Sequence, residues 1–232
     1  MVVRCNASMS ESSFWERPDV VERFGTRDPD RRLVALIERR GAEGLRALDI
    51  GCAAGRNAHY LASVGADIWA IDNSVPMVEA ARARLAAALG SQTEAEQRVL
   101  LGSMADLSAF DDASFDLVLA LGAFQNATTD AEWERTLAET ARVMAPGGLC
   151  LVANFAPDSR PHGRALEQVP GEANVYQGFG GPHRRISLFT ADALDATFAR
   201  HGLAAVEPTQ AVEVSTERGH RTTVNALYAK RS

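Results

Sequence analysis

The chain has 232 residues, of which 46% are hydrophobic, 23% charged and 6% aromatic. This length fits a single domain with added segments, and it provides enough buried surface for folding without disulfide or metal staples. The 24 Lys and Arg residues and 30 Asp and Glu residues give a net charge of −6, which argues against sequence-blind binding to nucleic acid. The composition also excludes a collagen, a coiled coil and a fully disordered chain.

The cysteines and the apolar runs indicate the cellular environment. The three cysteines, Cys5, Cys52 and Cys150, are too few and too widely spaced for a disulfide framework or a CxxC zinc pair. No apolar run reaches the roughly 18 residues of a membrane span, and residues 1–13 lack the apolar core of a signal peptide. We therefore expect a reduced cytoplasmic protein, monomeric or homodimeric, without a membrane or nucleic-acid partner.

Short apolar runs alternate with longer helical patterns over the first two thirds of the chain. Strands are expected over residues 45–50, 67–71, 99–101, 115–121 and 149–154. Helices are expected over residues 30–40, 57–64, 76–89 and 131–144, the last with a capping box formed by Thr129 and Glu132. Strands and helices that alternate with short connections are typical of a parallel sheet covered on both faces.

The pattern changes after the fifth strand. Prolines and glycines interrupt residues 156–185, a segment too long for a plain connection. A helix is expected over 191–200, and two alternating segments, 204–214 and 222–229, predict an antiparallel hairpin. Together these elements predict an α/β fold: a doubly wound, mostly parallel sheet of seven strands with helices on both faces, a C-terminal antiparallel hairpin and an insert after the fifth strand.

A turn of small residues follows the first strand. In the sequence DIGCAAGRN (residues 49–57), small residues allow the backbone to approach a ligand closely, and ligands in open parallel sheets bind above such a turn. Asp72 ends the next strand, where its carboxylate suits the two hydroxyls of a ribose. A dinucleotide site needs GxGxxG, but Ala53 and Arg56 replace its second and third glycines. The turn therefore favours a nucleoside ligand and argues against a dinucleotide oxidoreductase.

These residues resemble a known family. DIGCAAGR (49–56), followed by IDNS (71–74), resembles the first two motifs of the class I S-adenosylmethionine-dependent methyltransferases. Four further segments resemble later motifs of the family and occur in the same order: GSMAD (102–106), FDLVLA (115–120), VMAPGG (143–148) and the segment 189–203. The resemblance covers residues 33–229 and points especially to the small-molecule branches, of the methyltransferase type 11 and tellurite-resistance-like kinds. It implies a Rossmann-like methyltransferase domain over 30–232, an arm over 1–29 before it, and a substrate lid over 156–189.

The resemblance implies that the cofactor is S-adenosylmethionine. In the family, the acid that matches Asp49 lies near the methionine end of the cofactor, and the acid that matches Asp72 holds the ribose hydroxyls. Residues 104–106 would flank the adenine, and Ala53 stands where the family usually has glycine. The residues implied in cofactor binding are Asp49, Gly51, Cys52, Ala53, Gly55, Arg56, Asp72, Asn73, Met77, Met104, Ala105, Asp106 and Leu121.

The expected activity is transfer of a methyl group from S-adenosylmethionine to an O, N or C atom of a small-molecule acceptor. The alternatives are an RNA or protein methyltransferase, which a basic groove would favour, and a cofactor-binding protein without turnover. If the acceptor must lose a proton, His162 or His183 in the insert is the expected general base. Neither histidine has the spacing of a metal ligand, so no metal is expected. The residues expected to contact the acceptor are Phe14, Trp15, Phe124, Asn126, Tyr176, Phe179 and Arg184.

Overall fold

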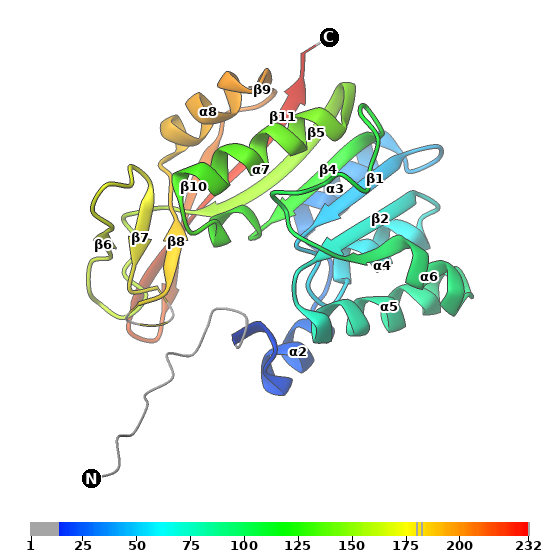
Figure 1. Cartoon of the computed structure of the whole chain (residues 1–232), viewed down its shortest axis with the longest axis horizontal. Coiled ribbons are helices and arrows are strands. Elements are labelled where there is room, and N and C mark those ends of the chain that lie inside the picture. The colour runs from blue at the N-terminus through cyan, green and yellow to red at the C-terminus, as the bar shows by residue number, and fades with distance from the viewer. Residues whose placement is uncertain (1–13, 180, 182, 232) are drawn as a thin grey trace.

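The computed structural model of the protein describes residues 14–179, 181 and 183–231. Eight strands form its main sheet, which lies between two layers of helices (Figure 1). The strands are β1 (Arg46–Ile50), β2 (Asp67–Asp72), β3 (Val99–Leu101), β4 (Phe115–Leu121), β5 (Met144–Phe155), β9 (Leu203–Ala205), β10 (Gln210–Thr216) and β11 (Gly219–Lys230). Their order is β10-β11-β5-β4-β1-β2-β3, and the short β9 pairs with β11.

The sheet is parallel over most of its width and antiparallel at one end. β3, β2, β1, β4 and β5 run parallel to one another, whereas β11 is antiparallel to β5 and to both β10 and β9. The predicted mostly parallel sheet with a C-terminal hairpin is therefore confirmed. The expected strand over 204–214 is divided into β9 and β10 by residues 206–209, which include Pro208, and this division adds the eighth strand.

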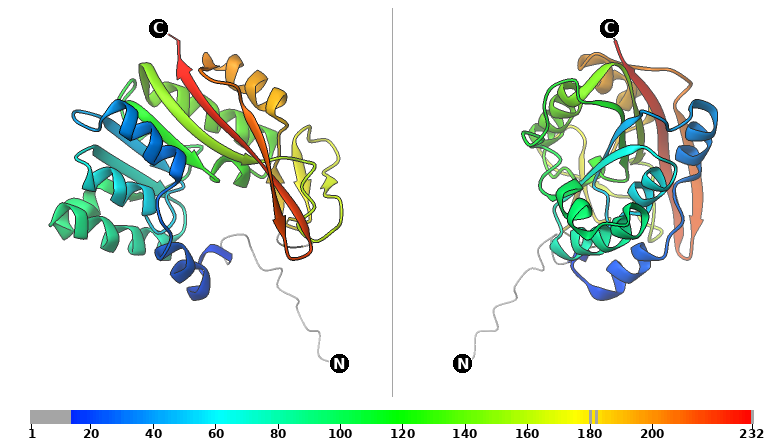
Figure 2. Two further views of the ribbon diagram at one scale, coloured as in Figure 1. Left: turned by 180° about the vertical axis from the view of Figure 1, so that it is seen from behind. Right: turned by 90° about the vertical axis from the view of Figure 1, so that its right-hand side faces the viewer.

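Helices cover both faces of the sheet (Figure 2). In β4, Val118 and Ala120 belong to a buried cluster with two helices on one face, and Leu117 and Leu119 belong to a second cluster with four helices on the other. Side chains that alternate between two buried faces explain why the strands read as continuous apolar runs. The first face carries α7 (Asp130–Val143) and α8 (Ala191–Arg200), and the second carries α3 (Arg31–Arg40), α4 (Arg56–Ser63) and α5 (Val75–Leu89), with α6 (Gln92–Arg98) after it.

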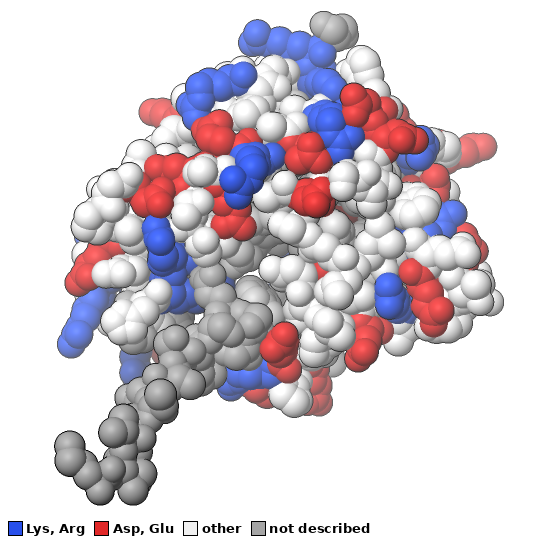
Figure 3. Space-filling view, in the orientation of Figure 1, with Lys and Arg blue, Asp and Glu red and all other residues white. Residues whose placement is uncertain are grey.

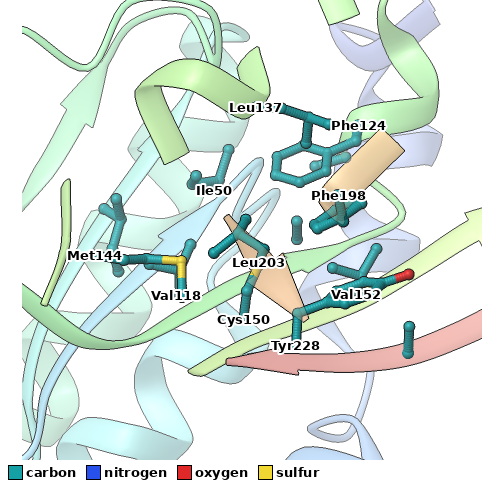
Figure 4. Close-up of a cluster of buried hydrophobic side chains, with 14 of the residues drawn as sticks. Ile50, Val118, Phe124, Leu137, Met144, Cys150, Val152, Phe198, Leu203 and Tyr228 are labelled. Atoms are coloured by element: carbon teal, nitrogen blue, oxygen red, sulfur yellow. The ribbon is translucent and has the colours of Figure 1, made fainter. Parts of the chain in front are cut away.

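Aromatic side chains fill the core on the face of α7 and α8. Phe198 stacks on Tyr228 with ring centroids 4.0 Å apart, and Phe124 meets Trp133 edge-on at 6.0 Å. Figure 4 shows Phe124 and Phe198 in this cluster, beside Leu137 of α7. Because aromatic rings bury large apolar areas, the cluster joins α7, α8, β11 and the short 3-10 turn η1 (Phe124–Asn126) firmly together.

The insert contains regular structure that the sequence did not predict. Its strands β6 (Glu167–Gln168), β7 (Val175–Gln177) and β8 (Arg185–Ser187) form a small antiparallel sheet. Strands of two or three residues are too short to show a period-two pattern in a sequence. Ser187 Oγ donates to the Ala127 carbonyl at 2.9 Å, and Asn154 Nδ2 donates to the Ser187 carbonyl at 3.1 Å. The insert is therefore fixed to the end of η1 and to β5.

The described part of the expected arm is docked on α5. It contains α2 (Pro18–Gly25), and Arg84 of α5 donates to the Gly25 carbonyl at 2.8 Å. Around the buried Met77 of α5 pack Phe14, Trp15, Val20 and Phe24. Residues 1–13 of the expected arm lie outside the described residues, so the division of the chain at residue 30 stays a prediction.

Candidate functional site

A cavity lies at the carboxyl ends of β1, β2 and β4, the position at which open parallel sheets bind ligands. Four loops that are distant in sequence meet there because their strands are neighbours in the sheet. The lining consists of Asp49 and residues 51–54 after β1, 71–73 after β2, 102–104 after β3 and 121–123 after β4, with Trp15, Phe24, Arg56, Asn57, Asn126 and Glu132 around them.

The turn after β1 needs glycine at two positions. Gly51 has a φ of 66°, and a Cβ there would lie 2.6 Å from the Ala123 side chain. Gly55 has a φ of 75°, and a Cβ there would lie 3.0 Å from Ala81 of α5. Both positions are therefore left-handed and closely packed, which only glycine accommodates without strain. Gly55 is buried and does not line the cavity, so its expected cofactor contact is replaced by packing against α5.

Asp72 holds the rest of this turn in place. Ala53 has a φ of 47°, a left-handed conformation that is unfavourable for alanine. The Asp72 carboxylate stabilises this conformation, because its Oδ2 accepts a hydrogen bond from the Ala53 N–H at 2.9 Å. Its Oδ1 accepts another from the Ser74 N–H at 3.0 Å. Burial raises the pKa of Asp72, and these backbone hydrogen bonds lower it. Each carboxylate oxygen keeps a second lone pair, which fits the two hydroxyls of a ribose.

Asp49 is a buried carboxylate with an unsatisfied oxygen. The residue is 1% exposed, and its Oδ2 has no hydrogen-bond partner among the described residues. The pKa of Asp49 is raised to about 7: burial is the main cause, Arg56 opposes the rise, and the nearby Asp72 adds to it. A buried acceptor without a partner is costly unless a ligand completes it. The Asp49 oxygen therefore fits the cationic end of a ligand such as S-adenosylmethionine, and Asp72 fits its ribose.

The segment expected beside the adenine lines the cavity only in part. Residues 102–104 reach the cavity, including the predicted Met104. Ala105 and Asp106 instead lie in a separate, open groove, where Asp106 is exposed. Met77 is fully buried beneath the arm and does not line the cavity either. Met77 is thus a core residue, and the chain turns away from the cavity after Met104, so the cofactor contacts of Ala105 and Asp106 stay predictions.

The opposite end of the cavity lies after β4. Asn126 Nδ2 donates to the carbonyls of Gly122 at 3.3 Å and Ala123 at 3.1 Å, which holds its amide at this end. The carboxylate-bearing Glu132 of α7 lines the cavity beside these residues. Phe124 was expected here, but it is fully buried in the aromatic core because η1 turns its ring toward α7 and α8.

The arm and the insert meet beside Asn126. Arg184 donates to Asn126 Oδ1 at 2.8 Å, and its guanidinium lies 5.4 Å from the Phe14 ring centroid and 5.8 Å from that of Trp15. Trp15 lines the cavity, whereas Phe14 packs edge-on against Trp15 at 5.1 Å. Arg184 of the insert thus contacts both the arm and Asn126 at this end of the cavity.

The remaining acceptor-site and catalytic candidates lie elsewhere. Tyr176 sits in β7 opposite Ile186, and the Phe179 ring stacks on Phe155 at 4.7 Å, so neither lines the cavity. His162 and His183 share a separate groove with arginines of the insert and the hairpin. Both histidines thus lie on the side of the β10–β11 turn and outside the cavity lining, so the structure does not support a role for either as general base.

The sequence pattern did not indicate several cavity residues. One of these is Ser103, which lies between the lining residues Gly102 and Met104 and would have been found if the whole loop after β3 had been included. Glu132 was interpreted only as a capping residue, a role that it also has in the structure. Within residues 14–179, 181 and 183–231, no three His, Cys, Asp or Glu residues gather as metal ligands. The helices of this same part of the chain include none with the length and apolarity of a membrane span.

Comparisons with known proteins agree with this geometry. Residues 48–152 match the family described as a methyltransferase domain. The chain is 31% identical over 183 residues to the malonyl-[acyl-carrier protein] O-methyltransferase of Geobacter sulfurreducens, covering 76% of this chain and 62% of that protein. It is 37% identical over 130 residues to the demethylmenaquinone methyltransferase of a Parafrankia species, covering 52% of this chain and 49% of that one. The chain therefore spans about half to three fifths of the length of these relatives.

A solved structure shows the same fold. The 1,6-didemethyltoxoflavin-N1-methyltransferase of Burkholderia thailandensis, solved with bound 1,6-didemethyltoxoflavin and S-adenosylhomocysteine, matches with a TM-score of 0.64 and 18% identity over 97% of this chain and 92% of that one. The cavity at the strand ends, the tight turn after β1 and the acid after β2 agree with the sequence motifs and with these matches. In its motifs, its fold and its matched segment the chain resembles the class I methyltransferases, and these findings support S-adenosylmethionine as the cofactor.

Proposed function

We propose that the protein transfers a methyl group from S-adenosylmethionine to an O, N or C atom of a small-molecule acceptor. The observation that carries the proposal is a single cavity with two chemically different ends. One end has the Asp72 carboxylate and the unsatisfied oxygen of Asp49, and the other has Asn126 and Glu132. The first end suits a nucleoside with a cationic tail, and the second leaves polar groups for an acceptor.

The chain contributes mainly by aligning the two substrates. When bound, S-adenosylmethionine supplies a sulfonium-bound methyl group with a good leaving group. The protein holds the nucleoside through Asp72 and the backbone of the turn at residues 51–54, and Asn126 is fixed by two carbonyls and Arg184. Fixed groups at both ends provide the alignment that is worth up to ~7–11 kcal/mol in well-oriented reactions.

Three observations support a small-molecule acceptor. The arm and the insert come together beside the acceptor end, which favours a covered site. Basic and acidic side chains are interspersed on the face shown in Figure 3, without a patch of one sign that would attract a nucleic acid. The relatives are named for malonyl-[acyl-carrier protein], demethylmenaquinone and 1,6-didemethyltoxoflavin. Residues 156–189 are accordingly proposed as a substrate lid, and a cytoplasmic location stays a prediction.

Two measurements test this function. Calorimetry should show binding of S-adenosylmethionine and S-adenosylhomocysteine, with no binding of NAD. Incubation with S-adenosylmethionine and pooled metabolites should release S-adenosylhomocysteine, and deconvolution of the active pool identifies the acceptor. Preference for NAD would overturn the proposed cofactor. Turnover on RNA or protein alone, with no active metabolite pool, would overturn the small-molecule acceptor.

A further inference from the structure

Only a few side chains can receive a proton inside the cavity. Among the described residues, the carboxylates that line it are Asp49, Asp72 and Glu132. Both oxygens of Asp72 accept backbone hydrogen bonds, and Asp49 is buried beneath the turn on the cofactor side. The histidines expected as general bases lie in a separate groove. Glu132 is therefore the carboxylate placed at the acceptor end.

Glu132 is held so that one of its oxygens stays available. Its Oε2 accepts hydrogen bonds from the Thr128 N–H at 2.8 Å and from the Thr128 hydroxyl at 3.0 Å. Its own N–H donates to Thr129 Oγ at 3.0 Å at the start of α7. Within the described part of the chain, Oε1 accepts no hydrogen bond. The residue is thus fixed through one oxygen, while the other remains free to accept a proton.

We infer that Glu132 is a catalytic carboxylate that accepts the proton of a hydroxyl or amine acceptor, an inference that rests on the proposed methyl transfer. As the lone pair of the acceptor forms a bond to the methyl carbon, the electron pair of the sulfur–carbon bond stays on sulfur. The O–H or N–H bond of the acceptor breaks, and its proton passes to Glu132 Oε1. The positive charge of the sulfonium and the negative charge of the carboxylate disappear together, so the step balances.

This assignment narrows the acceptor class. A hydroxyl or an amine brings a proton that Glu132 can receive, and general-base assistance contributes typically 10²–10⁴-fold. A carboxylate acceptor has no such proton, and its charge would be repelled by that of Glu132. The inference therefore assigns this chain an alcohol, phenol or amine acceptor, in contrast to the malonyl group for which one relative is named.

Two ligands test the placement of Glu132 without a known acceptor. S-adenosylmethionine and S-adenosylhomocysteine differ by the methyl group and its positive charge. If Glu132 faces the transferred methyl group, it attracts the charged ligand alone. Glu132→Gln should therefore weaken binding of S-adenosylmethionine at least about threefold in calorimetry, while binding of S-adenosylhomocysteine is unchanged. Glutamine also serves at this position of a capping box, so the variant keeps the start of α7.

A matched control lies on the same helix. Glu134 pairs with Arg200 and His201 outside the cavity, so Glu134→Gln should leave the affinities of both ligands unchanged. An unchanged ratio of the two affinities in Glu132→Gln would overturn the inference, whether both affinities fall or neither does. A wild-type protein that binds neither ligand would overturn the proposed function, and the inference with it.

Discussion

Asp49 and Asp72 end adjacent parallel strands, yet their surroundings differ. Asp72 is satisfied by backbone N–H groups of two turns, whereas Asp49 has a buried oxygen without a partner in the described residues. A buried carboxylate whose oxygens accept hydrogen bonds does not need a ligand. One with an unpartnered oxygen destabilises the folded protein unless a cation binds to it. The two acids therefore have opposite effects on the stability of the free protein.

Asp49→Asn should stabilise the ligand-free protein at alkaline pH. Burial raises the pKa of Asp49 to about 7 from an ordinary value of 3.8, so the folded state binds its proton more tightly than the unfolded state. The contribution of Asp49 to the free energy of unfolding is then greatest below pH 4 and is lost as the pH rises to 7, by about 4 kcal/mol at most. Asparagine cannot ionise, so the variant should melt several degrees above the wild type at pH 8 and much closer to it at pH 4.

The same substitution should weaken cofactor binding. The variant lacks the negative charge that complements a cationic ligand, so affinity for S-adenosylmethionine should fall at least about tenfold. Calorimetry and thermal melts at the two pH values measure both effects. A variant that melts below the wild type at pH 8 would show that Asp49 is not a destabilising buried charge.

Asp72→Ala should reduce both affinity and stability. It leaves two ribose hydroxyls without acceptors and also releases the Ala53 N–H that supports a left-handed turn. Hydrogen bonds to charged groups are worth ~1.5–3 kcal/mol, so affinity for S-adenosylhomocysteine should fall about ten- to a few-hundredfold. Asp106→Ala, at an exposed acid outside the cavity, is the matched control and should bind normally. Normal affinity in a folded Asp72→Ala protein would limit Asp72 to a structural role.

Sequence alone predicted the residues whose role depends on local pattern. The turn at 49–57 and Asp72 could be found because strand ends in a parallel sheet meet at one edge. Phe124 and Met77 could not be placed, because whether an apolar side chain faces a ligand or the core depends on helices elsewhere in the chain. Glu132 matched a capping pattern so well that its second role was not visible.

At the scale of elements, the arm and the insert depend on each other. The arm is docked on α5 through apolar packing, and its contact with the insert is made by Arg184. Cation–π contacts at partly exposed sites are worth ~0.5–1 kcal/mol each, and Arg184 makes two of them besides its hydrogen bond to Asn126. The contact between the arm and the insert lies beside Asn126, at the end of the cavity proposed for the acceptor.

Arg184→Met should loosen the arm without unfolding the domain. Methionine keeps the apolar stem but removes the charge over Phe14 and Trp15 and the hydrogen bond to Asn126. Amide hydrogen exchange over residues 14–25 should become faster, while the central strands β1 and β4 stay unchanged. Arg185→Met is the control, because Arg185 pairs with Glu172 inside the insert. Equal effects of the two substitutions would show that the arm is not held by Arg184.

The long elements were predictable and the short ones were not. Strands β1–β4 and helices α3, α4, α5, α7 and α8 were expected close to their observed bounds, because repeated apolar spacing identifies them. β5 was expected from residue 149 but begins at Met144, because its first residues include Pro146, Gly147 and Gly148, which have no strand pattern. The strands β6–β8 and the helices α2 and α6 were missed. Their form depends on contacts such as the hydrogen bond between Ser187 and Ala127, which no local pattern reveals.

At the scale of the whole molecule, the cavity and the C-terminal hairpin lie on different parts of the sheet. The cavity draws on loops after β1, β2, β3 and β4, together with the arm. The hairpin of β10 and β11 lies at the opposite edge of the sheet from β3, and β11 is joined to β5 by seven register pairs. A ligand in the cavity thus contacts the part of the sheet that contains β1–β4, and it leaves the hairpin untouched.

Binding of S-adenosylhomocysteine should therefore protect one half of the molecule. At a ligand concentration of ~100 Kd the folded state gains about 2.7 kcal/mol, which raises the Tm of a domain of this size by roughly 5–10 °C. Under native conditions, local protection from hydrogen exchange should concentrate in residues 51–57, 72–74 and 102–104, with little change over 210–217. The Asp72→Ala protein at the same ligand concentration is the control: its ten- to few-hundredfold weaker affinity should reduce the stabilisation to about 0.2–1.4 kcal/mol and weaken the local protection in proportion. Protection centred on the hairpin instead would mean that the cofactor binds on the opposite side of the sheet from the cavity described above.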